Sequence, residues 1–181
     1  VTKSKGDGNA EDFEMAPEQQ RITDEIVESV DEGKALLQKR DDRWQGEESE
    51  DDANLDAMSP AMPRRQALAI LGPAGSGKST VVQRAVKKVY EKEGRVLIAA
   101  PTGRLAATYR EKYPQLDVDT VHGAFLVFMP VQETLELMLP YDLIIVEEVG
   151  QLSQWIFERL MELWEAAERI PTLVFVGDFW Q

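Results

Sequence analysis

The chain of 181 residues has no cysteine and only one histidine, His122. The lack of cysteine excludes disulfides and cysteine-ligated zinc, and a lone histidine without clustered carboxylates makes a protein-caged metal site unexpected. No apolar run approaches the ~20 residues that a membrane span needs, and no hydrophobic signal region follows the first residues. We therefore expect an intracellular protein, without distinguishing nucleus, mitochondrion or cytoplasm. Because the chain lacks an initial methionine and stops at Gln181, we expect a fragment of a longer protein.

Basic residues are few, at 20 against 33 acidic ones, so the net charge is −13. This balance argues against a uniformly basic nucleic-acid binder. The charge is uneven, however: residues 1–63 carry −11, residues 64–110 carry +8 and residues 111–181 carry −10. The central segment suits a polyanion such as nucleotide or nucleic acid. The alternative is a solvated face of one helix, formed by Lys87, Lys88 and Lys92.

Composition divides the chain into four parts. Residues 1–16 are polar and acidic and are predicted to be a disordered tail. Residues 17–40 are predicted to form a helix, opened by Pro17 and carrying an apolar stripe. Residues 41–63 are acidic and contain two prolines, which indicates a disordered insertion or linker. Residues 64–181 are predicted to form the folded domain.

Within residues 64–181, short apolar strands alternate with helical segments. The predicted strands are residues 67–71, 95–100, 142–146 and 172–176. The main predicted helices are residues 81–90, 104–112 and 152–167, with a shorter one at 133–139; in the helix over 152–167, Trp155 is assigned to the core stripe. This alternation predicts an α/β fold with a parallel sheet covered by helices on both faces.

A phosphate-binding loop follows the first predicted strand. It fits the pattern G-x-x-x-x-G-K-[ST] and is followed directly by helical periodicity. Backbone N–H groups and the helix N-terminus would face phosphate, Lys78 would reach the outer phosphates, and Ser79 would supply a ligand to Mg²⁺. The candidate nucleotide-binding residues are Gly72, Pro73, Ala74, Gly75, Ser76, Gly77, Lys78, Ser79 and Thr80. The bland alternative is a glycine-rich turn.

Acidic residues close the third and fourth predicted strands, where a P-loop enzyme needs them. By position, Glu147 is the candidate magnesium residue and Glu148 the base that orients the attacking water. Asp178 and Gln181 follow the fourth strand and could sense the γ-phosphate. The alternatives are an acidic loop start for the first pair and a surface turn for the second.

Three further elements have weaker signals. Pro101, Thr102, Gly103 and Arg104 close the second strand and could grip the phosphates of a single strand, although an ordinary strand-to-helix turn fits equally well. His122 could contact nucleic acid or be a satisfied buried polar group. Gln19 and Gln20 could read an adenine edge or be surface glutamines.

Together, these segments resemble superfamily I DNA helicases of the PIF and RecD branch. Gln19 and Gln20 resemble the Q-motif, and Thr120-Val121-His122 resembles that branch's Thr-Ile-His element. The other motifs are 72–80 as motif I, 100–107 as motif Ia, 143–152 as motif II and 177–181 as the start of motif III. The resemblance implies a RecA-like P-loop NTPase domain that uses ATP and Mg²⁺, 5′-to-3′ movement on single-stranded DNA, a second RecA-like domain as partner, and DNA repair or recombination.

The chain departs from that family at two positions. Glu147 stands where motif II normally has aspartate, and Gly150 stands where it usually has serine. Two other functions are left open by the residues themselves: a P-loop ATPase or kinase that does not touch nucleic acid, and a non-catalytic nucleotide-binding module.

Overall fold

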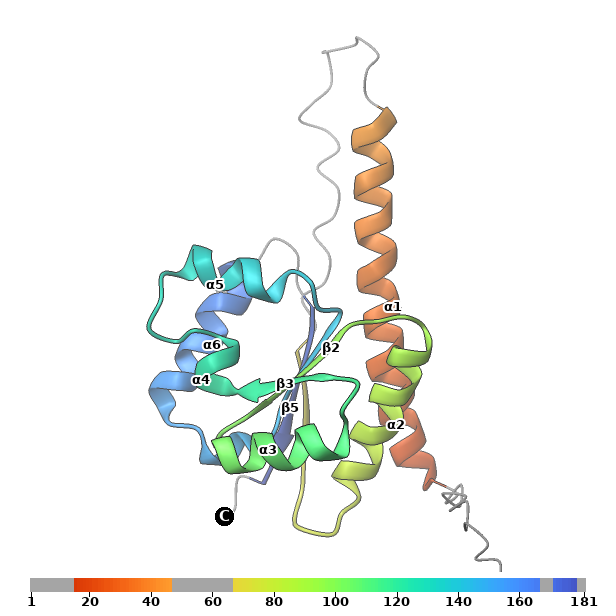
Figure 1. The fold of residues 1–181 in the computed structure, drawn as a ribbon. Helices are drawn as coiled ribbons and strands as arrows, with labels where there is room; N and C mark the ends of the chain where they lie inside the picture. The colour runs from red at the N-terminus through yellow and green to blue at the C-terminus, as the bar shows by residue number, and fades with distance from the viewer. Residues whose placement is uncertain (1–14, 47–66, 167–170, 179–181) are drawn as a thin grey trace, which may run out of the picture.

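The computed structural model describes residues 15–46, 67–166 and 171–178. They form a five-stranded sheet in the order β1-β5-β4-β2-β3, and every neighbouring pair is parallel (Figure 1). The strands are β1 (Ala67–Leu71), β2 (Val96–Ala100), β3 (Asp117–Thr120), β4 (Leu143–Val146) and β5 (Thr172–Gly177). The predicted parallel α/β sheet is confirmed.

Helices cover both faces of this sheet, as predicted. The helices α1 (Pro17–Gly46), α2 (Lys78–Glu91) and α3 (Gly103–Lys112) pack on one face. The other face is covered by α4 (Val121–Ala124), α5 (Val131–Met138) and α6 (Gln154–Ala166). A short 3₁₀ turn, η1 (Val149–Gln151), follows β4.

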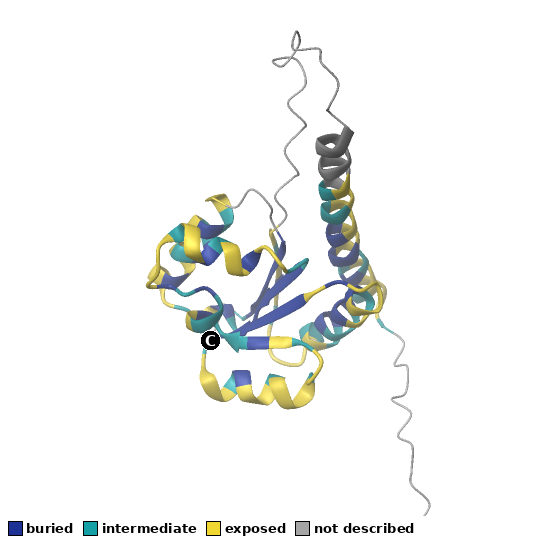
Figure 2. Cartoon of the chain, turned by 45° about the horizontal axis from the view of Figure 1, so that its top comes forward, coloured by how far each residue is buried: buried dark blue, intermediate teal, exposed yellow. Residues whose placement is uncertain are grey.

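The central strand β4 is apolar throughout because it is buried on both faces (Figure 2). Leu143 and Ile145 belong to the core formed with α1 and α2, whereas Ile144 and Val146 belong to the core formed with α4 to α6. Alternate residues of a strand point to opposite faces, so the residue after Val146 points toward α2. The sheet thereby directs Glu147 to the face that carries the phosphate-binding loop.

Helix α1 packs against α2 and contributes Ile26, Val27 and Val30 to the core. It begins at Pro17 as predicted, but it continues beyond residue 40 to Gly46. The predicted disordered segment 41–63 is therefore helical over its first residues, which include the good helix formers Arg43 and Gln45. The rest of that segment, and residues 1–14 of the predicted tail, lie outside the described residues. Among the helices the structure describes, none is long and apolar enough to cross a membrane.

The edge strand β3 is not predicted from sequence. The sequence of β3 does not look like that of a strand, because it contains Asp117 and Asp119 and aspartate is depleted in strands. In the structure each aspartate is paired on the solvent side, Asp117 with Arg95 and Asp119 with Arg110, each at 3.1 Å. Pairing at an exposed edge makes these charges compatible with the sheet.

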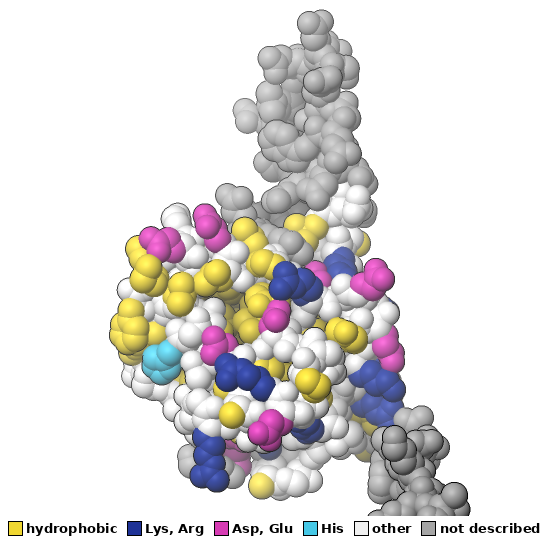
Figure 3. All heavy atoms as spheres, viewed as in Figure 1, with side chains coloured by type: hydrophobic (Ala, Val, Ile, Leu, Met, Phe, Trp, Pro, Cys, Tyr) yellow, Lys and Arg dark blue, Asp and Glu magenta, His cyan; other side chains and the backbone are white. Residues whose placement is uncertain are grey.

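The assignment of Trp155 to the core stripe of the last helix is wrong. Ile156, Leu160 and Leu163 are buried, whereas Trp155 is 50% exposed because it lies in the first turn of α6 on the outer side. Its ring lies 5.6 Å from that of Phe128, which is itself 82% exposed. Figure 3 shows hydrophobic side chains gathered over the side of the domain formed by α4, α5 and α6.

Candidate active site

The candidate site residues follow the carboxyl ends of the strands, and these ends lie on the same side of the sheet because all strands are parallel. The register pairs Leu71 with Gly177, and Val146 with both Phe175 and Ala99. The segments after β1, β2, β4 and β5 therefore leave the sheet together at the carboxyl ends of the strands. Ligands bind at this end in open α/β sheets. Strand β5 lies between β1 and β4, so its last residues separate the phosphate-binding loop from the acidic pair.

The phosphate-binding loop leaves β1 at Gly72 and turns into α2 at Lys78. Gly75 and Gly77 have φ values of +80° and +85°, which side chains rarely adopt, so the turn requires glycine at both positions. The ammonium of Lys78 donates to the carbonyl oxygens of Gly72, at 2.5 Å, and Pro73, at 2.9 Å. Lys78 thus lies folded over the loop. Of the remaining loop residues, Ala74, Ser76 and Ser79 are exposed and Thr80 is partly exposed at the start of α2.

Gln19 of α1 lies against this loop. Its Nε2 donates a long hydrogen bond of 3.5 Å to the carbonyl oxygen of Ser76, and its Oε1 accepts from the backbone N–H of Ala16 at 3.2 Å. The neighbouring Gln20 instead donates to Asp24 on α1. Of the two candidate glutamines, the structure therefore brings Gln19 to the loop and leaves Gln20 on the helix surface.

Glu147 is buried at the end of β4, with 5% of its surface exposed. Burial raises the pKa of its carboxyl to about 7, and the nearby Glu148 also raises it. A hydrogen bond with Tyr109 and the charges of Lys112 and Lys78 act in the opposite direction. A buried carboxylate near the loop lysine is the arrangement expected of a magnesium residue in a P-loop enzyme.

Tyr109, on α3, lies near Glu147 and lowers the pKa of that carboxyl against the effect of burial, and no sequence motif pointed to it. Burial raises the pKa of Tyr109, and the Glu147 carboxylate raises it further. Tyr109 shares a helix with Thr102 and Arg104, but its contact with Glu147 joins segments far apart in sequence. Only the fold brings them together.

Glu148 has a left-handed backbone, with φ 50° and ψ 47°. This conformation is uncommon for a residue with a side chain, and such residues concentrate at functional sites. The turn that follows packs against the end of β5: a Cβ on Gly150 would lie 2.5 Å from the carbonyl oxygen of Asp178. Glycine at position 150 is thus required by close packing of the two segments. Gln181 lies outside the described residues.

The candidate DNA contacts follow the carboxyl ends of β2 and β3. Thr102 caps α3, since its hydroxyl accepts from the N–H of Leu105 at 3.3 Å, and Arg104 is exposed in the first turn. Pro101 and Gly103 complete this turn. His122 is exposed on α4, with its ring 6.3 Å from that of Phe128, so the interpretation as a buried polar group is wrong.

The basic segment around the loop is largely paired within the protein. Lys88 bonds Asp24 at 2.7 Å and Lys92 bonds Asp31 at 2.5 Å, both across the contact of α2 with α1. Lys87 lies 3.8 Å from Glu91 on its own helix. Lys88 and Lys92 therefore link α2 to α1, and the +8 charge of residues 64–110 overstates what is available to a polyanion.

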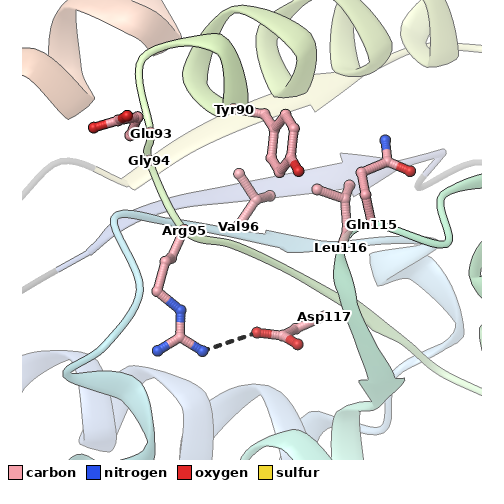
Figure 4. Close-up of a pocket in the computed structure, with 8 residues that line it drawn as sticks. All are labelled: Tyr90, Glu93, Gly94, Arg95, Val96, Gln115, Leu116 and Asp117. Atoms are coloured by element: carbon pink, nitrogen blue, oxygen red, sulfur yellow. Dashed lines mark hydrogen bonds and ion pairs between the residues drawn. The ribbon is translucent and has the colours of Figure 1, made fainter.

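A hollow lies at the amino-terminal ends of β2 and β3, opposite the candidate site (Figure 4). It has a volume of about 370 Å³ and includes Arg95 and Asp117, whose ion pair spans the starts of β2 and β3. None of the candidate site residues lines it. In the described part of the chain, no three acidic, histidine or cysteine side chains are grouped to hold a metal by themselves.

A glycine-rich phosphate loop between β1 and α2, with an acidic pair after β4, defines a P-loop NTPase domain. A family model described as "AAA domain" matches residues 55–181, and the chain belongs to this family. No match is found among curated proteins.

Solved structures of Pif1 helicases share the fold. The crystal structure of Pif1 helicase from Candida albicans is 17% identical, with a TM-score of 0.58 over 93% of this chain and 33% of that chain. A structure described as the basis for DNA unwinding at forked dsDNA by two coordinating Pif1 helicases is 19% identical, with a TM-score of 0.53 over 93% of this chain and 34% of that chain. The predicted RecA-like fold is confirmed. This chain spans about a third of the length of each of these relatives.

Proposed function

We propose that this chain is the ATP-binding motor domain of a DNA helicase of the Pif1 kind. The main support for the proposal is that Lys78, Glu147 and the Thr102–Arg104 turn lie at the carboxyl ends of the strands of one sheet. This sheet has the fold of the Pif1 helicase structures. A nucleotide site and a nucleic-acid site side by side are what an ATP-driven translocase needs.

Nucleotide binding follows from the loop. The backbone from Gly72 to Thr80 and the start of α2 would hold the phosphates, and Lys78 would exchange its two carbonyl partners for phosphate oxygens. Gln19 would add its amide to the nucleotide side of the loop. Asp178, which directly follows β5, and Gln181, further along the sequence, would report the γ-phosphate to the rest of the motor.

The residues also fit Mg²⁺. This ion usually takes one or two protein oxygens together with substrate phosphates and waters, so a dedicated cluster is not needed. The exposed hydroxyl of Ser79 and the buried carboxylate of Glu147 are two such oxygens. Bound Mg²⁺ would neutralise charge on the phosphates. Glu148 would accept a proton from the attacking water.

Single-stranded DNA would contact half-buried Pro101 and four exposed residues at the neighbouring strand ends: Thr102, Gly103, Arg104 and His122. The N-terminus of α3 offers N–H groups and Arg104 a positive charge to backbone phosphates. By the resemblance, movement would be 5′-to-3′ and would need a second RecA-like domain. The second RecA-like domain would supply an arginine that stabilises the transition state. In related phosphoryl transfers such an arginine raises the rate by a factor on the order of 10³–10⁵. The same resemblance implies a role in DNA repair or recombination, and the sequence composition favours an intracellular location.

Phosphate release with and without single-stranded DNA tests this proposal, on the 181-residue chain and on the full-length protein. We expect the chain to bind Mg-ATP, hydrolyse it slowly and not unwind duplex, and we expect the full-length protein to show DNA-stimulated turnover. Full-length turnover that ignores DNA would favour a P-loop ATPase or kinase. Nucleotide binding without hydrolysis, even by the full-length protein, would favour a non-catalytic nucleotide-binding module.

A further inference from the structure

Three aromatic side chains form a row on the side of the domain where hydrophobic side chains gather (Figure 3). The ring of His122 lies 6.3 Å from that of Phe128, and the ring of Phe128 lies 5.6 Å from that of Trp155. Neighbouring ring planes are tilted by 34° and 31°. All three residues are exposed, Phe128 the most. The aromatic row, His122, Phe128 and Trp155, is therefore accessible to a ligand.

The chain around Phe128 directs its ring outward. The two residues that flank this stretch on the core side, Phe125 and Val127, are buried in the core formed with α4 to α6. Between them, Leu126 has a φ of +36°, in the left-handed region that a side chain rarely adopts. Such a conformation persists only where the surrounding structure holds it, and it concentrates at functional sites. Phe128 thus stands on an anchored turn.

Helix α6 fixes this turn from the other side. Arg159, whose side chain is only 11% exposed, donates to the carbonyl oxygen of Met129 at 2.5 Å and pairs with Glu162 at 2.7 Å. The same helix carries Trp155 in its first turn. The contact of Arg159 with Met129 therefore holds the rings of Phe128 and Trp155 next to each other.

The aromatic row begins beside the candidate DNA contacts. In the parallel pairing of β2 with β3, Ala100 lies opposite Thr120. The Thr102–Arg104 turn and His122 therefore leave the sheet from neighbouring strands, two residues after a paired position. From this point the row extends away from the turn through Phe128 to Trp155. A surface that suits phosphates thus continues into one that suits flat, apolar rings.

We propose that the aromatic row is a stacking platform for the bases of the single strand whose phosphates contact the Thr102–Arg104 turn. This inference rests on the proposed function. Proteins that bind single-stranded nucleic acid combine backbone contacts with aromatic side chains on which bases stack. Stacking uses the faces of the rings and needs no positive charge, so it suits a part of the chain where residues 111–181 carry −10. Bases in a duplex already stack on one another, so the platform selects single strands.

The test compares two oligonucleotides of equal length, one normal and one abasic, in fluorescence anisotropy titrations with the full-length protein. Phe128→Ala should weaken binding of the normal single strand about 10-fold, the scale of one lost base stack. It should leave binding of the abasic strand unchanged, because that strand keeps its phosphates and has no bases. Phe128→Trp should restore the affinity. Since Phe128 is 82% exposed, its truncation leaves the core intact.

Two further variants serve as comparisons. Tyr90→Ala is the matched control, because Tyr90 is an aromatic residue with 49% exposure that lines the hollow at the amino-terminal ends of the strands, and it should keep wild-type affinity. Arg104→Ala should lower the slope of log affinity against log salt concentration by about 0.7, the value for one phosphate contact on a single strand. Phe128→Ala should leave that slope unchanged, because a base stack releases no counterions.

The outcomes separate the inference from the proposed function. Equal losses of Phe128→Ala on normal and abasic strands overturn the inference, because they indicate a disturbed backbone site. Unchanged binding of both strands also overturns it, and leaves a protein partner as the occupant of the aromatic row. If the wild-type protein binds no single-stranded DNA, the proposed function fails, and the inference fails with it.

Discussion

The side-chain amide of Gln19 lies 3.5 Å from the carbonyl oxygen of Ser76, which ties the first turn of α1 to the phosphate-binding loop. The same amide lies where a side chain on Gly77 would have to go, with its Nε2 2.1 Å from the ideal Cβ position. Helix α1 therefore contacts the phosphate-binding loop as well as contributing to the core.

Gln19→Ala should weaken ATP binding about 3–10-fold, the effect of losing one hydrogen bond worth roughly 0.5–1.5 kcal/mol. It should also reduce the preference for ATP over GTP, which competition between the two nucleotides measures. Gln20→Ala is the control, since Gln20 bonds Asp24 on its own helix. Equal effects of the two substitutions would contradict a nucleotide role for Gln19.

Gly150→Ala should destabilise the domain by about 1–3 kcal/mol, the usual cost of overpacking. The added methyl would meet a backbone oxygen, that of Asp178, which cannot rotate away. Urea unfolding measures the loss. Gly33→Ala is the matched control: it has nothing within 4 Å of its ideal Cβ and lies inside α1, so it should be neutral or stabilising by up to ~1 kcal/mol. A neutral Gly150→Ala would mean that η1 and the end of β5 are not packed as described.

Glu148→Gln should lower DNA-stimulated phosphate release by the full-length protein about 10²–10⁴-fold, because it removes the base while keeping the side-chain shape. Binding of a non-hydrolysable ATP analogue should be unaffected. Glu158→Gln, an exposed carboxylate on α6, should leave both unchanged. Retained turnover in Glu148→Gln would assign the base elsewhere.

The raised pKa of Glu147, about 7 against the ordinary 4.5, makes the stability of the nucleotide-free protein depend on pH. The folded state holds this proton more tightly than the unfolded state, so the contribution is fully present below about pH 4.5 and is lost as pH rises through about 7. Glu147→Gln mimics the protonated form. It should therefore raise the free energy of unfolding at pH 8 by about 1–3 kcal/mol.

Denaturant unfolding at pH 8 and pH 5 checks this prediction, since the advantage of Glu147→Gln should shrink toward the lower pH. A constant difference across that range would show that Glu147 is not buried as described.

Local sequence patterns predicted the elements whose structure depends mainly on neighbouring residues. The buried strands, the loop between β1 and α2, and the helix opened by Pro17 follow from apolar runs, glycine spacing and a helix-starting proline. Glu147 was expected at the carboxyl end of a parallel strand, and it directly follows β4, whose last residue, Val146, pairs with Ala99 of β2.

Features that depend on distant partners were not predictable. Strand β3 has two aspartates that become compatible with a sheet only through Arg95 and Arg110. The basic segment seemed available to a polyanion because its partners, Asp24 and Asp31, lie on α1. Tyr109 had no motif, since its effect on the pKa of Glu147 acts between segments far apart in sequence.

The most direct test of the central claim is an equilibrium titration of a fluorescent ATP analogue, with Mg²⁺, into the wild-type chain and Lys78→Ala. The ammonium of Lys78 is the point charge that the outer phosphates need, so its removal should abolish most of the binding. Lys87→Ala is the control, because Lys87 lies on the same helix and bonds only toward Glu91 among the ion pairs of the described residues. Lost binding for Lys78→Ala with wild-type affinity for Lys87→Ala is the result we predict, and equal affinity for wild type and Lys78→Ala would contradict the nucleotide site.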